Sequence, residues 1–172
     1  ILTDCTKGPQ KIIWERSKRL WPHHHAPWTH PSIGAILGCG SIKRLKDANN
    51  EQNETLTNPI EVRKPKYQDG KARLLSILLA ESAYLIWVIR CEIVIQGKEI
   101  PDRIIAKRWI DTINRRIQTD RFLAKNRNYR KINSSLVKNT WKGTLKNEES
   151  IQTDWVTALE VLVGIDSPDP SI

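Results

Sequence analysis

Histidines and cysteines are the residues of this chain whose types point most directly to a metal. His23, His24, His25 and His30 lie close together, and Cys39 follows them. Imidazole and thiolate are zinc ligands, but no Cys-x2-Cys pair completes a site here. Three consecutive histidines cannot all turn the same way. A solvated loop is therefore the alternative interpretation, and the role of these histidines stays open.

Cys5 supports a second, conditional metal hypothesis. The chain begins without Met, and none occurs in its 172 residues, so we expect it to be part of a longer protein. A histidine directly before Ile1 would give a His-x4-Cys pattern, the closing half of a zinc knuckle-like site. Alone, Cys5 is a small apolar residue beside the first helix. We therefore expect no cofactor in this chain, and zinc only in the full-length protein.

Other reactive side chains give little indication of an enzyme. Residues 34–43 are glycine-rich, but neither phosphate-binding glycine motif is complete. Cys39 has no base at a recognisable spacing, which makes nucleophilic catalysis improbable. Glu81 lies inside an apolar stretch and is either an acid with a raised pKa or a structural residue paired with Arg90 or Arg73. The structural role is favoured, and no catalytic residue is predicted.

Basic residues form the clearest chemical signal. The net charge is +9, and residues 99–131 alone hold ten Lys or Arg against four acids. A localised excess of positive charge favours polyanions, because binding releases condensed counterions. A solvated helix face is the alternative. The residues predicted to contact the phosphates of RNA or DNA are Arg103, Lys107, Arg108, Arg115, Arg121, Lys125, Arg127, Arg130 and Lys131. Trp28 and Tyr129 are candidates for stacking on bases.

A long apolar helix must position these residues. From Leu74 to Ile95 apolar residues fall on nearly every helical face, which is typical of a core helix or a membrane span. Glu81 interrupts the apolar run, and a carboxylate near its middle is expensive in lipid. We therefore predict a buried core helix that ends at Gly97 and makes no membrane contact. Trp87 lies on its apolar surface and is expected to pack into the core.

Shorter amphipathic helices are predicted around it. Residues 13–21 form one apolar stripe, which Pro22 ends. Pro101 begins a helix with a basic face, in which Asp111 and Arg115 form an i,i+4 pair. Ser134 or Ser135 caps a further helix, and residues 154–162 are either a helical turn or a strand.

The predicted fold is mainly α, a small helical domain around one central apolar helix, with a disordered linker and tails. Residues 1–45 form an N-terminal helical segment containing the end of a zinc-binding-like region. Residues 46–70 read as a linker, because Asn, Pro and Gly interrupt every periodicity. Residues 71–165 form the helical domain, and residues 166–172 a disordered tail.

Several sequence blocks resemble one family of fungal proteins. They are Ile36-Leu37-Gly38-Cys39-Gly40, residues 75–96, residues 108–116, residues 140–145 and residues 161–165. These blocks are similar to the C-terminal region of basidiomycete non-LTR (LINE-type) retrotransposon polyproteins, downstream of their reverse transcriptase and RNase H domains. The opening residues Leu2, Cys5 and Trp14 are similar to the end of the reverse-transcriptase zinc-binding segment, in which the cysteine is the last ligand.

The resemblance implies a non-catalytic accessory segment whose basic helix assists binding of RNA or DNA. It also implies an intracellular, nuclear, non-secreted protein whose partners include the upstream polyprotein domains. Two alternatives stay open. One is a protein-interaction or scaffold domain that packs on the RNase H portion, and the other is a non-functional fragment of a decayed element.

Overall fold

A computed structural model describes residues 8–22, 27–43, 45, 69–126, 131–151, 154–158 and 161–164. The elements are α1 (Pro9–Leu20), α2 (Ile33–Leu37), η1 (Cys39–Ser41), α3 (Gly70–Gln96), α4 (Asp102–Lys125), α5 (Ser134–Trp141), η2 (Glu148–Ser150) and α6 (Trp155–Ala158). Within these ranges the only β-type pairing is an isolated antiparallel bridge between Leu145 and Val163. The prediction of a mainly α protein is confirmed.

Helix α3 is the central element, and it is longer than its apolar stretch. Asp69 caps its N-terminus by accepting a hydrogen bond of 2.7 Å from the backbone N–H of Ala72. Gly97 ends the helix in the left-handed region, with a φ of 64°, as a C-terminal glycine commonly does. Leu74, Leu78, Ile86 and Ile89 are completely buried along one side. The apolar core is therefore built on α3.

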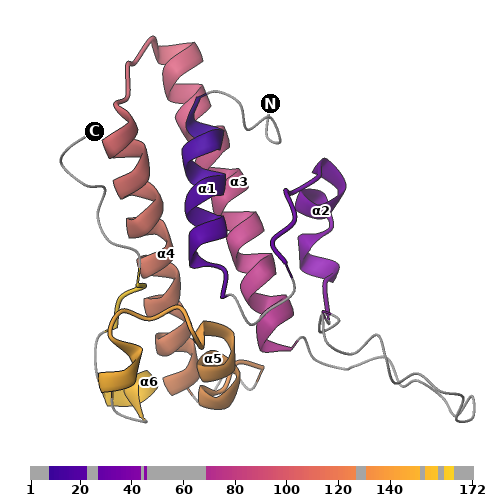
Figure 1. The fold of residues 1–172 in the computed structure, drawn as a ribbon, viewed down its shortest axis with the longest axis vertical. Helices are drawn as coiled ribbons and strands as arrows, with labels where there is room; N and C mark the ends of the chain where they lie inside the picture. Colours follow the sequence, from indigo (N-terminus) through magenta and orange to yellow (C-terminus); the bar gives the residue numbers. More distant parts are fainter. Residues whose placement is uncertain are drawn as a thin grey trace, which may run out of the picture.

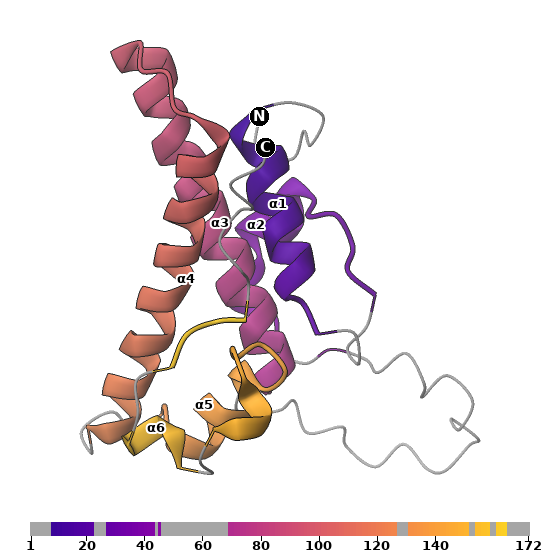
Figure 2. The same cartoon turned by 60° about the vertical axis from the view of Figure 1, so that its left-hand side comes forward.

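Helices α1 and α4 pack against α3 and against each other (Figures 1 and 2). Trp109 of α4 donates from Nε1 to Ser82 Oγ of α3 at 2.9 Å, and Ser82 Oγ lies 2.9 Å from Ser17 Oγ of α1. Small serines at this contact let three helices approach closely while the indole N–H finds an acceptor. Segments on both sides of residues 46–70 thus share one core.

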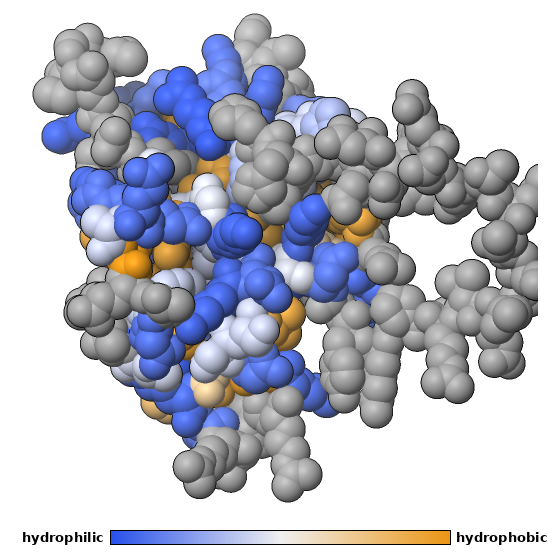
Figure 3. Space-filling view, turned by 60° about the horizontal axis from the view of Figure 1, so that its bottom comes forward, coloured by the Kyte–Doolittle hydropathy of each residue, from blue (hydrophilic) through white to orange (hydrophobic). Residues whose placement is uncertain are grey.

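Two short helices, α5 and α6, cover the end of the molecule where α3 begins and α4 finishes (Figure 1). Val137 and Trp141 bring the apolar face of α5 into the core. Its cap is Asn133, whose Oδ1 accepts from the backbone N–H of Leu136 at 2.8 Å, so the predicted caps Ser134 and Ser135 are one and two residues too late. Seen from this end, the described surface is mostly hydrophilic, with small apolar patches (Figure 3).

The described part of the C-terminal segment, residues 161–164, runs as a strap against α4. Val163 N–H donates to Asn114 Oδ1 at 2.9 Å, and Gln118 Nε2 donates to the Val161 carbonyl at 2.7 Å. Beside them, the backbone N–H of Gly164 donates to the Thr144 carbonyl. Within the range 154–162, for which a helical turn or a strand was predicted, the described residues form the helical turn α6 (Trp155–Ala158); Val161 and Leu162 belong to the strap, and residues 159–160 lie outside the described residues.

The second half of α3 is open on one side. Trp87 is 57% exposed, and Val94 and Ile95 are exposed further along, so the prediction that Trp87 packs into the core is wrong. Among the described helices, α3 is the one long and apolar enough to cross a membrane by length and composition, and half of its most apolar window is buried within the fold. A core helix passes the same test, so this property does not choose between the two.

Candidate nucleic-acid interface

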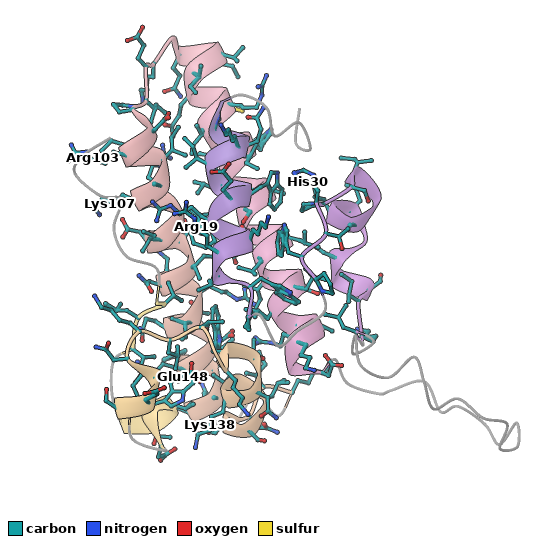
Figure 4. All side chains as sticks on the ribbon, viewed as in Figure 1. Arg19, His30, Arg103, Lys107, Lys138 and Glu148 are labelled. Atoms are coloured by element: carbon teal, nitrogen blue, oxygen red, sulfur yellow. The ribbon has the colours of Figure 1, made fainter. Side chains whose placement is uncertain are left out.

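The cationic surface of α4 follows from the spacing of its residues. Ile105, Trp109, Ile113 and Ile117 repeat every four residues and are buried, so the side chains on the opposite side of the helix face outward. Four predicted phosphate-binding residues on this helix are exposed, namely Arg103, Lys107, Arg115 and Lys125. Lys131, just before α5, is exposed as well. Figure 4 shows Arg103 and Lys107 pointing away from the helices packed behind α4.

Helix α1 adds further cations next to α4. Lys11, Lys18 and Arg19 are exposed, and Arg19 lies at the level of Lys107 in Figure 4. Arg16 of the same helix is instead buried, and its burial together with the charge of Arg19 lowers its pKa. The sequence prediction placed the phosphate contacts on the later segment alone, and the pairing of α1 with α4 extends the cationic surface.

Not every predicted arginine belongs to this surface. Arg121 is only 8% exposed and donates from a terminal nitrogen to Gln118 Oε1. The prediction that it lies on the exposed cationic face of α4 is therefore wrong. The helical wheel places Arg121 beside the exposed residues, but the neighbouring segments α5 and α6 cover that end of α4. Arg127, Arg130 and Tyr129 lie outside the described residues.

Arg108 is half-buried and occupied by an ion pair. Its two terminal nitrogens lie 2.7 and 2.9 Å from the two carboxylate oxygens of Glu92 on α3. This bidentate pairing lowers the pKa of Glu92, first through the hydrogen bonds and then through the charge of the guanidinium. The same hydrogen bonds raise the pKa of Arg108. Arg108 therefore ties α4 to α3 and has less freedom to reach a phosphate.

The intrahelical pairing on α4 differs from the predicted one. Asp111 pairs with Lys107, Oδ2 to Nζ at 2.8 Å, and not with Arg115. Both partners are exposed, so this pair is worth at most about 1 kcal/mol and breaks easily. Arg115 has no ion-pair partner among the described residues. Arg103 is likewise exposed and without an ion-pair partner among the described residues, so both of these α4 arginines have charges available to a ligand.

A buried charged network joins α3, α4 and α5, and sequence reasoning missed it. Asp120 is fully buried, and its carboxylate oxygens accept from both terminal nitrogens of Arg73 at 2.6 and 2.7 Å. Trp141 Nε1 donates to the same carboxylate at 2.9 Å, and Arg116 Nε lies 3.5 Å away. One signal was present: Asp120 falls on the buried arc of α4, three residues after Ile117.

Glu81 forms an ion pair with an arginine, but not with either of the two expected partners. Its Oε1 lies 3.5 Å from a terminal nitrogen of Arg116 on α4. The expected partners were Arg90 and Arg73, and both assignments are wrong, because Arg73 is held by Asp120. Arg116 thus lies within 3.5 Å of two acids, Glu81 and Asp120.

The metal hypotheses gain no support from the described part of the chain. No group of three or more His, Cys, Asp or Glu residues lies close enough there to hold an ion. His30 packs edge-on against Trp14, with ring centroids 6.4 Å apart, and Cys39 is a half-buried free thiol. Cys5 and His23, His24 and His25 lie outside the described residues, as do nearly all of the predicted linker and the tail.

Among the hollows of the described part of the chain, two border α3. One, of about 380 Å³, lies between the loop before α2 and helix α3 and includes Trp28, whose ring packs edge-on against Trp21 at a centroid distance of 5.9 Å. Trp28 is therefore engaged within the fold rather than standing out as a stacking platform. The other, of about 320 Å³, is a groove between α3 and α4 that Tyr84 and Arg115 both line.

Comparison with known proteins identifies no relative. No family model matches the chain, and neither curated proteins nor solved structures give a significant match.

Proposed function

We propose that this chain is a non-catalytic helical module that binds nucleic acid through cations exposed on α4. The observation that carries the proposal is that Arg103, Lys107, Arg115 and Lys125 remain exposed on one helix, which is held in the core by its buried residues Ile105, Trp109, Ile113 and Ile117. Exposed cations without buried partners neutralise phosphates, and their binding is governed by counterion release. Lys131 and the cations of α1 extend the surface available to a backbone.

Salt dependence tests the proposal directly. The logarithm of the binding constant falls with the logarithm of salt by about 0.7 to 0.9 per phosphate contact. The triple variant Arg103→Glu, Lys107→Glu, Arg115→Glu is therefore expected to weaken binding of a 20-nucleotide RNA at low salt and to reduce the slope by roughly two to three units. Fluorescence anisotropy across a salt series measures both quantities.

A matched triple variant controls for net charge. Lys43, Lys142 and Lys146 are exposed and lie outside α1 and α4. Their replacement by glutamate changes the net charge by the same amount and is expected to leave the salt slope unchanged. Equal effects of the two triple variants, or no salt-dependent binding by the natural chain, would count against the proposal.

The retroelement origin remains a proposal that rests on the sequence blocks. We propose that the module belongs to a polyprotein whose reverse transcriptase and RNase H domains precede it and which acts in the nucleus. The coding frame before Ile1 tests this: a histidine directly upstream, and a Cys-x2-Cys pair before it, would supply Cys5 with the missing zinc ligands. An unrelated upstream sequence would contradict the assignment.

A protein-interaction role is a second candidate, and one observation favours it. Val94 and Ile95 are 69% and 78% exposed near the end of α3, where a contiguous apolar surface is typical of a partner contact. Under this alternative, the upstream RNase H portion covers the end of α3. Co-purification of the two parts, lost in Val94→Asp but not in Arg115→Glu, would favour the scaffold role.

A further inference from the structure

Two exposed aromatic rings lie side by side on α3. Tyr84 and Trp87 are 64% and 57% exposed, and their ring centroids are 5.9 Å apart with a tilt of 34° between the planes. They are three residues apart on the helix, which places them on neighbouring positions of one face. Large aromatic side chains usually turn inward, so an exposed pair held together on a rigid helix is a feature that needs an explanation.

One ring of the pair, that of Tyr84, lines a groove that also contains an arginine without an ion-pair partner among the described residues. Tyr84, Leu85 and Val88 line the α3 side of the groove, and Arg108, Thr112 and Arg115 line the α4 side. Two acids, Glu81 and Asp111, also line it. Each of them already has a partner outside the groove lining, Arg116 for Glu81 and Lys107 for Asp111.

When these ion pairs are taken into account, one cation of the groove, Arg115, is not neutralised by an acid among the described residues. Arg108 is matched by Glu92 at 2.7 Å, whereas Arg115 has no ion-pair partner among the described residues. Arg115 and the ring of Tyr84 thus stand on opposite walls of one hollow, across which a phosphate and the adjoining base can be held together. A positively charged groove flanked by stacking rings is the arrangement by which proteins hold single strands.

We infer that the ligand of this surface is single-stranded nucleic acid, with Tyr84 and Trp87 stacking on unpaired bases while Arg115 contacts the backbone. The inference rests on the proposed function and specifies its ligand. A duplex keeps its base faces inside the stack, where exposed rings on a helix cannot reach them. A protein partner that covered the rings and supplied an acid for Arg115 would confer no affinity for a single strand, which the experiment below measures.

The test separates stacking from charge. Trp87→Leu and Tyr84→Leu keep apolar bulk and remove the π face, and Leu37→Ala on α2, at a residue 79% exposed, is the control for loss of an exposed apolar group. Each variant is titrated in the full chain with a labelled 20-nucleotide oligouridylate and with a 20-base-pair RNA duplex. Thermal unfolding followed by circular dichroism verifies that each variant is folded, and light scattering gives its oligomeric state.

The expected result is a loss of single-strand affinity of roughly fivefold to 100-fold for either leucine variant, the range given by loss of one stacked base. Their salt slope, their duplex affinity and the affinity of Leu37→Ala should stay as in the natural chain.

Equal losses on both nucleic acids, or no loss on the single strand, would overturn the inference while leaving phosphate binding intact. A change in oligomeric state with unchanged affinity would also overturn it and assign the rings to contact between chains. Absence of any salt-dependent binding would instead refute the proposed function.

Discussion

Asp120 is the residue on which the packing of three helices depends. Its carboxylate neutralises Arg73 and accepts from Trp141, and the ion pair is removed from solvent on both sides. A buried ion pair adds little when complete, because the cost of desolvation offsets the attraction. It becomes expensive when one charge is left alone.

The variant Asp120→Asn should therefore lower the free energy of unfolding by about 3–5 kcal/mol, because the buried Arg73 guanidinium loses its counter-charge. Urea denaturation measures the change. The matched control is Asp111→Asn, which breaks the exposed pair with Lys107 and should cost no more than about 1 kcal/mol. Similar small costs for both variants would show that Arg73 finds water or another partner.

A second prediction concerns pH and Glu92. The hydrogen bonds from Arg108 lower the pKa of Glu92 in the folded chain, so the folded state favours its charged form. This contribution is present above the ordinary pKa of a glutamate and is lost as the pH falls through the lowered folded value. The difference in unfolding free energy between the natural chain and Glu92→Gln should shrink on acidification from pH 7 to pH 3. A difference that stays constant over this range would contradict the pairing.

These residues mark the limit of sequence reasoning. The buried arc of α4 was predictable because isoleucine and tryptophan repeat at helical spacing. The burial of Arg121 and the Arg73–Asp120 pair was not, because a charged residue is buried only when a neighbouring element covers or neutralises it. Which elements meet is set by long-range packing that the spacing within one helix does not contain.

At the scale of the element, the start of α3 depends on a close approach to α5. A Cβ added at Gly70 would lie 2.6 Å from the backbone carbonyl carbon and oxygen of Asn139, so the two helices would have to separate. The sequence prediction counted Gly70 as the last linker residue because Asn, Pro and Gly interrupt the periodicity of residues 46–70. In the structure it is the first residue of the helix, where the absence of a side chain admits the neighbouring backbone.

Gly70→Ala is accordingly expected to destabilise the chain by about 1–3 kcal/mol, as overpacking does. Gly40→Ala is the matched control: its added Cβ meets no atom within 4 Å, and it should change stability by less than about 1 kcal/mol. Thermal unfolding of the two variants under identical conditions compares them. A neutral Gly70→Ala would mean that α3 and α5 shift apart without loss of packing.

At the scale of the whole molecule, the N-terminal segment and the later helices form one core. Ile13 and Trp14 of α1 are almost completely buried in the cluster that also contains residues of α3, α4 and α5. Composition alone suggested a boundary at residues 46–70, because polar and helix-breaking residues gather there. The composition of residues 46–70 does not indicate whether the segments before and after them contact each other. The shared core was therefore not predictable from these residues.

A chain that begins at Asp69 should therefore not fold with the stability of the natural chain. Removal of α1 exposes the sides of α3 and α4 that Trp14 and Ile13 cover. The remaining helices then bury less apolar surface when they fold, so the free energy of unfolding falls. We expect a lower thermal midpoint and increased binding of a hydrophobic dye. A control chain that begins at Gly8 retains α1 and should match the natural chain. Cooperative unfolding of the shorter chain at an unchanged midpoint would show two independent units.

The strap of residues 161–164 has a consequence for synthesis on the ribosome. Val163 is bound to Asn114, 49 residues earlier in the chain, and Gly164 to the carbonyl of Thr144. Contacts of such sequence separation form only after the later partner has left the exit tunnel, and they slow folding because a long loop must close first. Helices α1, α3 and α4 are thus synthesised before residues 161–164, so the hydrogen bonds of the strap to Asn114 and Gln118 of α4 form only after all three helices have been made.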